Sequence, residues 1–83
     1  MSIYAIEIND GVYGLIEIGY SSEFESYFFN LYDYIDNSLL VEICYPESVL
    51  SSVEILVLEL SKYEVQIDDE MVIQLRRDQI RAV

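Results

Sequence analysis

The chain has 83 residues, a length that fits one small domain and leaves little room for a buried cleft around a large cofactor. Sixteen acidic residues stand against four basic residues and no histidine, so the formal net charge is −12, which argues against direct binding to nucleic acid. Hydrophobic residues make up 53% of the sequence, which excludes disorder caused by low hydrophobicity. We therefore predict a single acidic domain over residues 1–83.

The charges are unevenly placed along the chain. Residues 1–61 hold eleven acids and no base, because all four bases come later: Lys62, Arg76, Arg77 and Arg81. Such a field repels nucleic acid and anionic membranes and attracts basic proteins. A plainer interpretation, in which the acids serve only solubility, stays open because charge speaks about association rather than fold.

The first segment, residues 3–20, has the pattern of a β-hairpin. Asn9-Asp10-Gly11 separates two runs rich in Ile, Val and Tyr, and a three-residue loop here would pair Ile8 with Val12. In that register one face of the hairpin meets the core, and its members are Tyr4, Ile6, Ile8, Val12 and Ile16. The other face sees solvent or a partner, and its members are Glu7, Tyr13 and Glu17.

Residues 22–37 follow the pattern of a helix. Ser22-Glu23-Phe24-Glu25 matches a capping box, and a core stripe at helical spacing comprises Phe24, Tyr27, Phe28, Leu31 and Ile35. The far side of this helix would carry Glu25, Phe29, Asp33 and Asp36, an apolar ring among carboxylates. We predict this group as the contact surface for a basic partner; the alternative is that Phe29 is covered by the C-terminal segment of the same chain.

A third strand is predicted over residues 39–45, which Pro46 ends. From Pro46 to Tyr63 apolar residues recur at helical spacing, although residues 53–60 also allow a strand; we favour the helix. Ile55 and Leu58 are apolar beyond the core stripe, so this helix is either nearly surrounded by protein or contributes to an interface.

The tail, residues 63–83, reads as two short strands around the acidic turn Asp68-Asp69-Glu70, followed by a last basic turn of helix. The competing interpretation is one helix from Asp69 to the end, because four residues have helical spacing: Val72, Leu75, Gln79 and Val83. The whole pattern predicts an α+β fold, in which an antiparallel sheet packs against two α-helices in the order β-β-α-β-α-β-β.

The sequence lacks the parts of most catalytic and metal sites. Without histidine there is no Ser-His or Cys-His nucleophile, and a zinc site lacks its usual ligands. The three glycines do not form a phosphate-binding loop, and Asp68-Asp69-Glu70 lacks the spacing of a calcium loop. Cys44, the only cysteine, lies in an apolar run and is expected to be a buried, inert thiol. We predict no enzyme activity, no cofactor and no metal.

Binding to a basic protein remains as the positive expectation. A domain that displays carboxylates and aromatic rings can occupy a groove that otherwise holds phosphates and bases, because Arg binds carboxylates much as it binds phosphates. In size and charge the chain is similar to phage-encoded inhibitors of host defence, such as anti-CRISPR or anti-restriction proteins, and to immunity proteins of nuclease toxins. These groups share no motif, so the similarity transfers no residue roles.

These features predict a small inhibitor that acts in the cytoplasm of a bacterium or bacterial host cell, without a membrane segment or direct nucleic-acid contact. The alternative is an acidic structural or adaptor module that self-associates, for instance as a homodimer.

Overall fold

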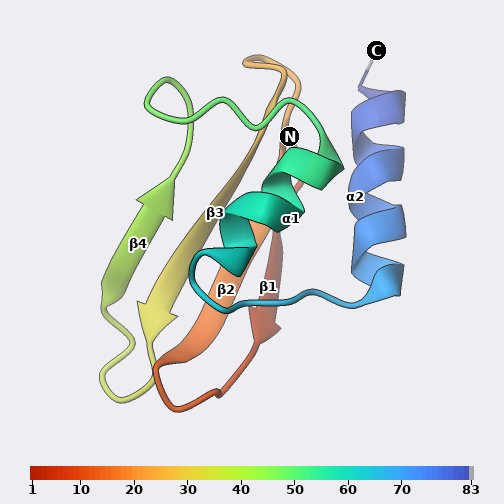
Figure 1. Cartoon of the computed structure of the whole chain (residues 1–83). Helices are drawn as coiled ribbons and strands as arrows, with labels where there is room; N and C mark the ends of the chain where they lie inside the picture. The colour runs from red at the N-terminus through yellow and green to blue at the C-terminus, as the bar shows by residue number, and fades with distance from the viewer. Residues whose placement is uncertain (83) are drawn as a thin grey trace.

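The computed structural model describes residues 1–82 and shows an α+β fold, as predicted (Figure 1). Four antiparallel strands lie in the sheet order β1-β2-β3-β4 and are followed by two helices. The element order is thus β-β-β-β-α-α, which differs from the predicted order at residues 22–37 and in the tail. The elements are β1 (Tyr4–Glu7), β2 (Tyr13–Ser21), β3 (Ser26–Asp33), β4 (Leu39–Ile43), α1 (Val53–Ser61) and α2 (Asp69–Arg81).

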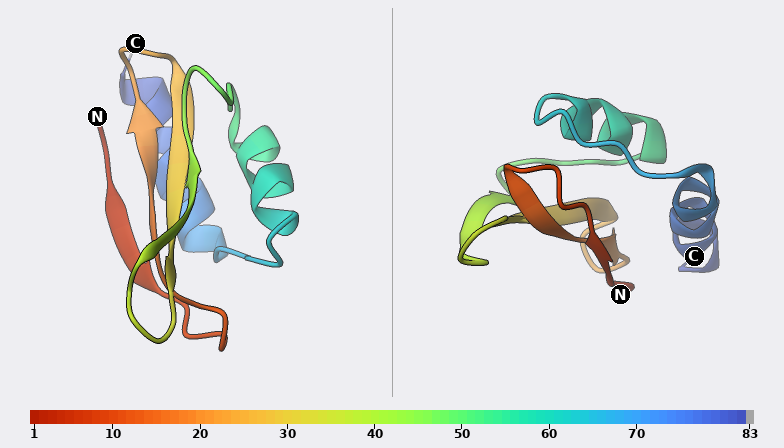
Figure 2. Two further views of the ribbon diagram at one scale, coloured as in Figure 1. Left: turned by 90° about the vertical axis from the view of Figure 1, so that its left-hand side faces the viewer. Right: turned by 90° about the horizontal axis from the view of Figure 1, so that it is seen from below.

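Both helices lie on the same side of the sheet. Helix α1 packs over β3, and α2 packs beside α1 and against β2. Figure 2 shows the helices on one side and no element of the described chain, residues 1–82, on the other. The sheet therefore has one covered face and one face that is free of helices.

The N-terminal hairpin is confirmed, but its loop is longer than predicted. The backbone N–H of Ile8 donates to the carbonyl oxygen of Gly14 (3.0 Å), so Ile8 pairs with Gly14 and not with Val12. The Asp10 carboxylate holds the longer loop, because it accepts from the backbone N–H groups of Val12 (2.8 Å) and Tyr13 (2.7 Å). Val12 is 59% exposed, so its predicted place in the core is wrong.

A β-bulge then changes the direction of Tyr13. The register between β2 and β3 shifts between Tyr13 and Leu15, which inserts an extra residue at Gly14. Tyr13 consequently packs against the hydrophobic core on the helix side of the sheet. Its predicted place beside Glu7 and Glu17 is wrong, because a bulge reverses the alternation on which that prediction relied.

The predicted helix over residues 22–37 is wrong, because most of this segment forms β3. Tyr27, Phe29 and Leu31 are each fully buried at a spacing of two, which is the period of a strand. Phe24 and Ile35, which the helical stripe would bury, are exposed. The apparent capping box is the turn between β2 and β3. Aromatic residues are frequent in strands, and pairing with β2 on one side and β4 on the other outweighs the local helix signals.

The strand predicted over residues 39–45 and the helix predicted between Pro46 and Tyr63 are confirmed as β4 and α1. The helix begins at Val53 rather than at Pro46, and Ser52 caps it by accepting from the backbone N–H of Ile55 (3.3 Å). The intervening segment returns to the sheet, where the backbone N–H of Tyr27 donates to the carbonyl oxygen of Leu50 (2.8 Å).

The tail forms one helix, α2, so the two short strands predicted there are wrong and the competing helix is correct. Asp68 caps α2 by accepting from the backbone N–H of Met71 (2.8 Å), and Leu75 is fully buried. The acidic run that resembled a turn is therefore an N-cap followed by a favourably charged first helical turn. The predicted extension to Val83 lies outside the described residues.

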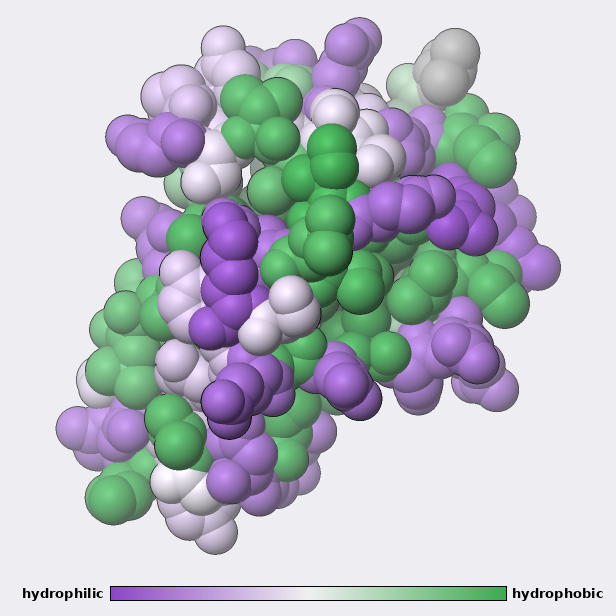
Figure 3. Space-filling view, viewed as in Figure 1, coloured by the Kyte–Doolittle hydropathy of each residue, from purple (hydrophilic) through white to green (hydrophobic). Residues whose placement is uncertain are grey.

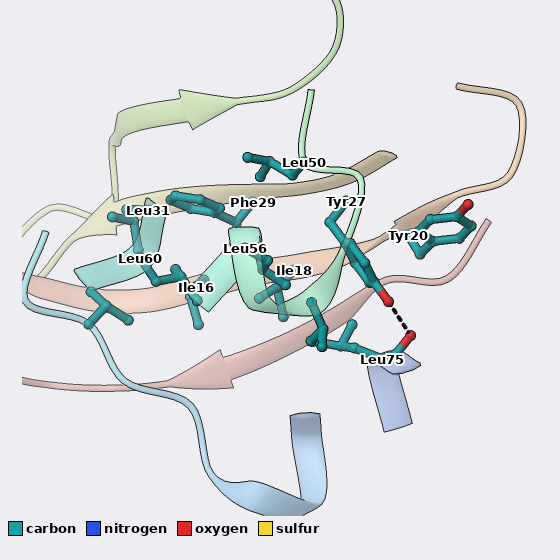
Figure 4. Close-up of a cluster of buried hydrophobic side chains, with 12 residues drawn as sticks. Ile16, Ile18, Tyr20, Tyr27, Phe29, Leu31, Leu50, Leu56, Leu60 and Leu75 are labelled. Atoms are coloured by element: carbon teal, nitrogen blue, oxygen red, sulfur yellow. Dashed lines mark hydrogen bonds between the residues drawn. The ribbon is translucent and has the colours of Figure 1, made fainter. Parts of the chain in front are cut away.

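The core fills the space between the covered face and the two helices (Figure 4). Tyr27 joins the layers, because its hydroxyl donates to the carbonyl oxygen of Leu75 in α2 (2.8 Å). The buried hydrophobic residues are Ile16, Ile18, Tyr20, Tyr27, Phe29, Leu31, Leu50, Val53, Leu56, Leu60, Val65 and Leu75.

Gly19 of β2 leaves no space for a side chain, which yields the first prediction. A Cβ atom at this position would lie 1.9 Å from the carbonyl oxygen of Ser2, so Gly19→Ala must displace the N-terminal segment. We expect a loss of about 1–3 kcal/mol in the free energy of unfolding, measured with urea. Gly11→Ala is the control, since nothing lies within 4 Å of its Cβ position and only its φ of 92° opposes substitution. An unchanged unfolding free energy in Gly19→Ala would contradict the steric argument.

The second prediction concerns alkaline pH. Burial, with smaller contributions from neighbouring charges, raises the pKa of Tyr27 from 10.0 to about 12. The unfolded chain then loses this proton first, so the stabilising contribution is present below pH 10 and falls as the pH rises towards 12. We expect Tyr27→Phe to show a shallower loss of unfolding free energy over this window, in urea titrations at several pH values. Parallel pH profiles for Tyr27→Phe and the unsubstituted chain would contradict it.

Candidate functional site

The uncovered face of the sheet is the candidate site, and we call it the open face. Alternation along each strand and pairing between strands place its side chains opposite the buried set. The open face includes Ala5, Glu7, Leu15, Glu17, Phe28, Asn30, Tyr32, Leu39 and Glu42.

Its three carboxylates are spread over three strands. Glu17 pairs with Asn30, and Asn30 pairs with Glu42. The two glutamates therefore occupy one row with a strand between them, and their Cα atoms lie about 10 Å apart. Glu7 lies diagonally from Glu17 across the β1–β2 pair, at roughly 7–8 Å. A rigid sheet thus displays three negative charges at fixed spacing.

Glu17 is held in place by its neighbours on β3. The Tyr32 hydroxyl and the Asn30 side-chain amide (3.5 Å) both donate to Oε1 of Glu17. The hydrogen bond to this carboxylate raises the pKa of Tyr32, with a smaller contribution from burial. Because both bonds end on Oε1, Oε2 keeps its acceptor capacity for a partner.

Charge is segregated between the two sides of the molecule. Residues 1–52, the sheet and its connections, contain nine acids and no base, whereas residues 53–83 contain seven acids and all four bases. Both ion pairs found among residues 1–82 lie in the helical half: Lys62 with Glu59 (2.6 Å) and Arg76 with Glu54 (3.2 Å). The carboxylates of the open face therefore have no basic side chain from their own half of the chain.

An apolar groove of about 200 Å³ lies at one end of the open face. The rings of Phe24 and Tyr45 form one wall, stacked with centroids 4.7 Å apart and planes 10° apart. Phe28, Ile3 and Cys44 add apolar surface from the sheet side. The groove and the carboxylates together give the composition of an interface, an apolar anchor site beside polar groups.

The structure brings together only two of the seven residues predicted to bind a partner. Glu7 and Glu17 share the open face as expected. Phe29 is fully buried and packs edge-on against Tyr63, with ring centroids 6.0 Å apart, so its predicted exposure is wrong and the alternative, cover by the C-terminal part of the chain, is correct. Tyr13 lies on the helix side.

The remaining three predicted residues lie at opposite ends of β3, Glu25 before it and Asp33 and Asp36 at its close. The Asp33 carboxylate accepts from the backbone N–H groups of Ile35 (3.3 Å) and Asp36 (3.1 Å). Asp36 accepts from the backbone (3.0 Å) and hydroxyl (2.7 Å) of Ser38, and these hydrogen bonds lower the pKa of Asp36. Glu25 precedes β3, and a strand of eight residues spans about 26 Å, so no common surface joins Glu25 to the two aspartates.

Sequence reasoning missed Asn30, Tyr32 and Glu42. The sequence does contain a signal for two of them, the two-residue period of a strand. With this period residues 26–33 place Phe28, Asn30 and Tyr32 on the face opposite Phe29. Glu42 lies in a strand that was predicted, but its position beside Asn30 depends on pairing that the sequence did not reveal.

Residues 1–82 contain no group of three or more side chains arranged to hold a metal ion. Burial, together with the nearby charges of Glu42 and Glu47, raises the pKa of Cys44, which disfavours the reactive thiolate. Within residues 1–82 no helix has the length and apolar character to cross a membrane.

Comparisons of the chain with protein families, with curated proteins and with solved structures found no significant match.

The hydrogen bond between Tyr32 and Glu17 yields the third prediction. Replacing Glu17 by Gln removes the charged acceptor that stabilises the protonated phenol, so the pKa of Tyr32 should fall towards its ordinary value. The measurement is an NMR titration of ¹³C-labelled tyrosines. Glu7→Gln is the control, since Glu7 lies on β1 opposite Leu15 and the Tyr32 hydroxyl donates to Glu17. An unchanged Tyr32 pKa in Glu17→Gln would mean that the bond does not persist in solution.

Proposed function

We propose that this protein is a small acidic inhibitor that binds and blocks a basic nucleic-acid-binding protein or nuclease. One observation carries the proposal: the open face displays Glu7, Glu17 and Glu42 on a rigid sheet whose half of the chain has no base. Uncompensated charge on one face raises the negative potential there, and a cationic partner relieves it.

The open face is complementary in charge and composition to a groove with which a partner protein binds phosphates. Such a groove presents Arg and Lys to the backbone of a nucleic acid and apolar or aromatic surfaces to its bases. The carboxylates take the place of phosphates, and Arg binds them through two parallel hydrogen bonds. The apolar groove beside Phe28 accepts a side chain of the partner, which supplies the desolvated centre of the contact.

Two settings use proteins of this kind. A phage-encoded inhibitor blocks a defence effector such as a restriction enzyme or an RNA-guided nuclease, and an immunity protein masks the basic active site of a nuclease toxin. Both act in the cytoplasm of a bacterial cell.

A second candidate function is an acidic adaptor that self-associates, and the surface of α1 favours it. Ile55, Val57 and Leu58 are exposed apolar side chains on this helix. Figure 3 shows apolar side chains in green on the helix side of the molecule, interspersed with polar ones. Self-association through α1 would leave the open face free, so the two functions predict different contact surfaces.

The fourth prediction separates them with two matched variants. One replaces Glu7, Glu17 and Glu42 of the open face by Gln, and the other replaces three helix-side acids, Glu64→Gln, Asp69→Asn and Glu70→Gln, which removes equal charge. Against a panel of purified restriction and RNA-guided nucleases and nuclease toxins, we expect the unsubstituted chain to inhibit one member. The open-face variant should lose roughly tenfold or more in association rate, and the helix-side variant should lose much less.

Ionic strength provides the second measurement. The association rate of the unsubstituted chain should fall steeply as salt shortens the Debye length from about 10 Å at 0.1 M to about 3 Å at 1 M. A protein that inhibits no member of the panel and forms a salt-insensitive dimer would overturn the proposal in favour of the adaptor.

A further inference from the structure

Strand β4 forms an unprotected edge of the sheet. It pairs with β3 on one side, and among the elements of residues 1–82 it contacts no other. Sheet edges are ordinarily blunted by proline, lysine, a β-bulge or a covering helix, and the sequence Leu39–Ile43 contains neither proline nor lysine. The register shift of β4 lies between its pairs with Leu31 and Tyr32, so the pairs of Val41 and Ile43 with β3 are regular. Figure 1 shows β4 at the side of the sheet away from α2. Its outer backbone groups are therefore accessible to another chain.

The hydrogen bonds of β3 show which residue of β4 turns its backbone outward. The backbone N–H groups of Tyr27 and Asp33 donate to Leu50 and Ser38 on the β4 side (both 2.8 Å), whereas that of Tyr34 donates to Val12 on the β2 side (3.0 Å). Odd-numbered residues of β3 thus direct their polar groups towards β4.

The same alternation fixes the direction of the groups in β4. Val41 and Ile43 lie opposite Leu31 and Phe29, so they exchange bonds with β3, and the backbone N–H and C=O of Glu42 between them point to the free edge. The Glu42 side chain meanwhile belongs to the open face. One residue therefore offers a backbone pairing position and a carboxylate to the same neighbour.

The opposite edge differs in its surroundings. Strand β1 lies next to α2, where the Tyr4 hydroxyl donates to the Asp78 carboxylate (2.7 Å). The backbone groups of Ala5 and Glu7 point to this edge, because Ser2 and Ile8 bond to β2 and the direction alternates between them. Glu7 also carries a carboxylate, but Arg81 of α2 lines a cavity with Met1 and Ser2 beside β1, so a base stands at this edge, whereas β4 and the segments on either side of it contain none.

We infer that the β4 edge binds an extended basic segment of the partner protein as a fifth strand, with Lys or Arg opposite Glu42. This inference rests on the proposed function and specifies how the partner is held. A residue that pairs with Glu42 through both backbone groups lies about 5.5 Å away between Cα atoms and points its side chain to the same face. Charge complementarity selects the occupant, since the acids around β4 are Asp33, Asp36, Glu42 and Glu47 and no base lies among them.

A second copy of this chain fits the edge poorly. In an antiparallel pair of two β4 strands centred on Val41, the two Glu42 side chains lie on one face as diagonal neighbours, roughly 7–8 Å apart. Each copy also brings a net charge of −12. Like charges at this spacing oppose pairing.

The fifth prediction tests the edge with a ten-residue peptide of alternating lysine and valine, whose binding is followed by fluorescence anisotropy. Glu42→Gln keeps the backbone N–H and removes the charge, so affinity should fall about two- to fivefold. Glu42→Pro also removes the outward N–H, which an edge strand tolerates, and affinity should fall by roughly a further tenfold. Glu64→Gln removes an equal charge from an exposed position outside the sheet and should leave affinity nearly unchanged.

A measurement on the unsubstituted chain covers the case in which Glu42→Pro perturbs the fold. Hydrogen exchange of the Glu42 amide should slow when the peptide is added, whereas Val41 and Ile43 should be protected beforehand. A peptide of alternating glutamate and valine should give no protection. Equal affinity of Glu42→Pro and Glu42→Gln, or an unprotected Glu42 amide in the presence of the lysine peptide, would overturn the inference.

Three further outcomes test the choice of occupant and separate this inference from the proposed function. Protection of the Glu42 amide that rises with protein concentration, without peptide, would show that a second copy occupies the edge and would overturn the choice of occupant. If Glu42→Pro and Glu42→Gln inhibit a nuclease equally well, strand addition at the β4 edge is refuted and the proposed function stands. Peptide binding without inhibition of any nuclease would support the edge and refute the proposed function.

Discussion

The burial of alternate side chains along β3 is the constraint on which the rest of the structure depends. Tyr27, Phe29 and Leu31 are fully buried, so this central strand must turn its other face away from both helices. Tyr27 also ties the strand to α2 through its hydroxyl. Because Phe28, Asn30 and Tyr32 alternate with the buried three, the same packing that forms the core also creates the open face. Core and candidate site are thus two consequences of one register.

The distribution of charge follows the same division. A carboxylate costs little folding free energy where water solvates it. Glu7 and Glu42 are exposed on the open face, so their charges are solvated. The bases are placed where they reduce repulsion between helix residues, as in the pairs of Lys62 with Glu59 and Arg76 with Glu54. Exposed pairs of this kind add little stability, so the hydrophobic core must outweigh the self-repulsion of the sheet half. An acidic face maintained against that cost is what a basic partner would neutralise.

The sequence predicted the fold class, the hairpin, β4 and the presence of α1, because each has a local signal: a turn between β-rich runs, a short apolar run, and apolar residues at helical spacing. It failed where the signals compete. The aromatic run around Phe29 satisfies a helical and a strand period together, and only pairing with β2 and β4 decides between them. The bulge at Gly14 moved Tyr13 to the other face, which no local pattern indicated. Glu7 and Glu17 were identified because the hairpin was correct, whereas the site residues assigned to the false helix did not form one surface.

The position of Glu42 connects these points. Its side chain completes the row that begins at Glu17, and its backbone lies on the edge that no other element of residues 1–82 covers, so the acidic face and this edge meet at Glu42. A contact through side chains alone selects a partner by charge and leaves its orientation loosely defined, while backbone pairing fixes direction and register. Together they would hold a basic strand in one orientation against the open face. The geometry of β4 therefore offers a small domain, with a limited surface, specificity beyond that of its net charge.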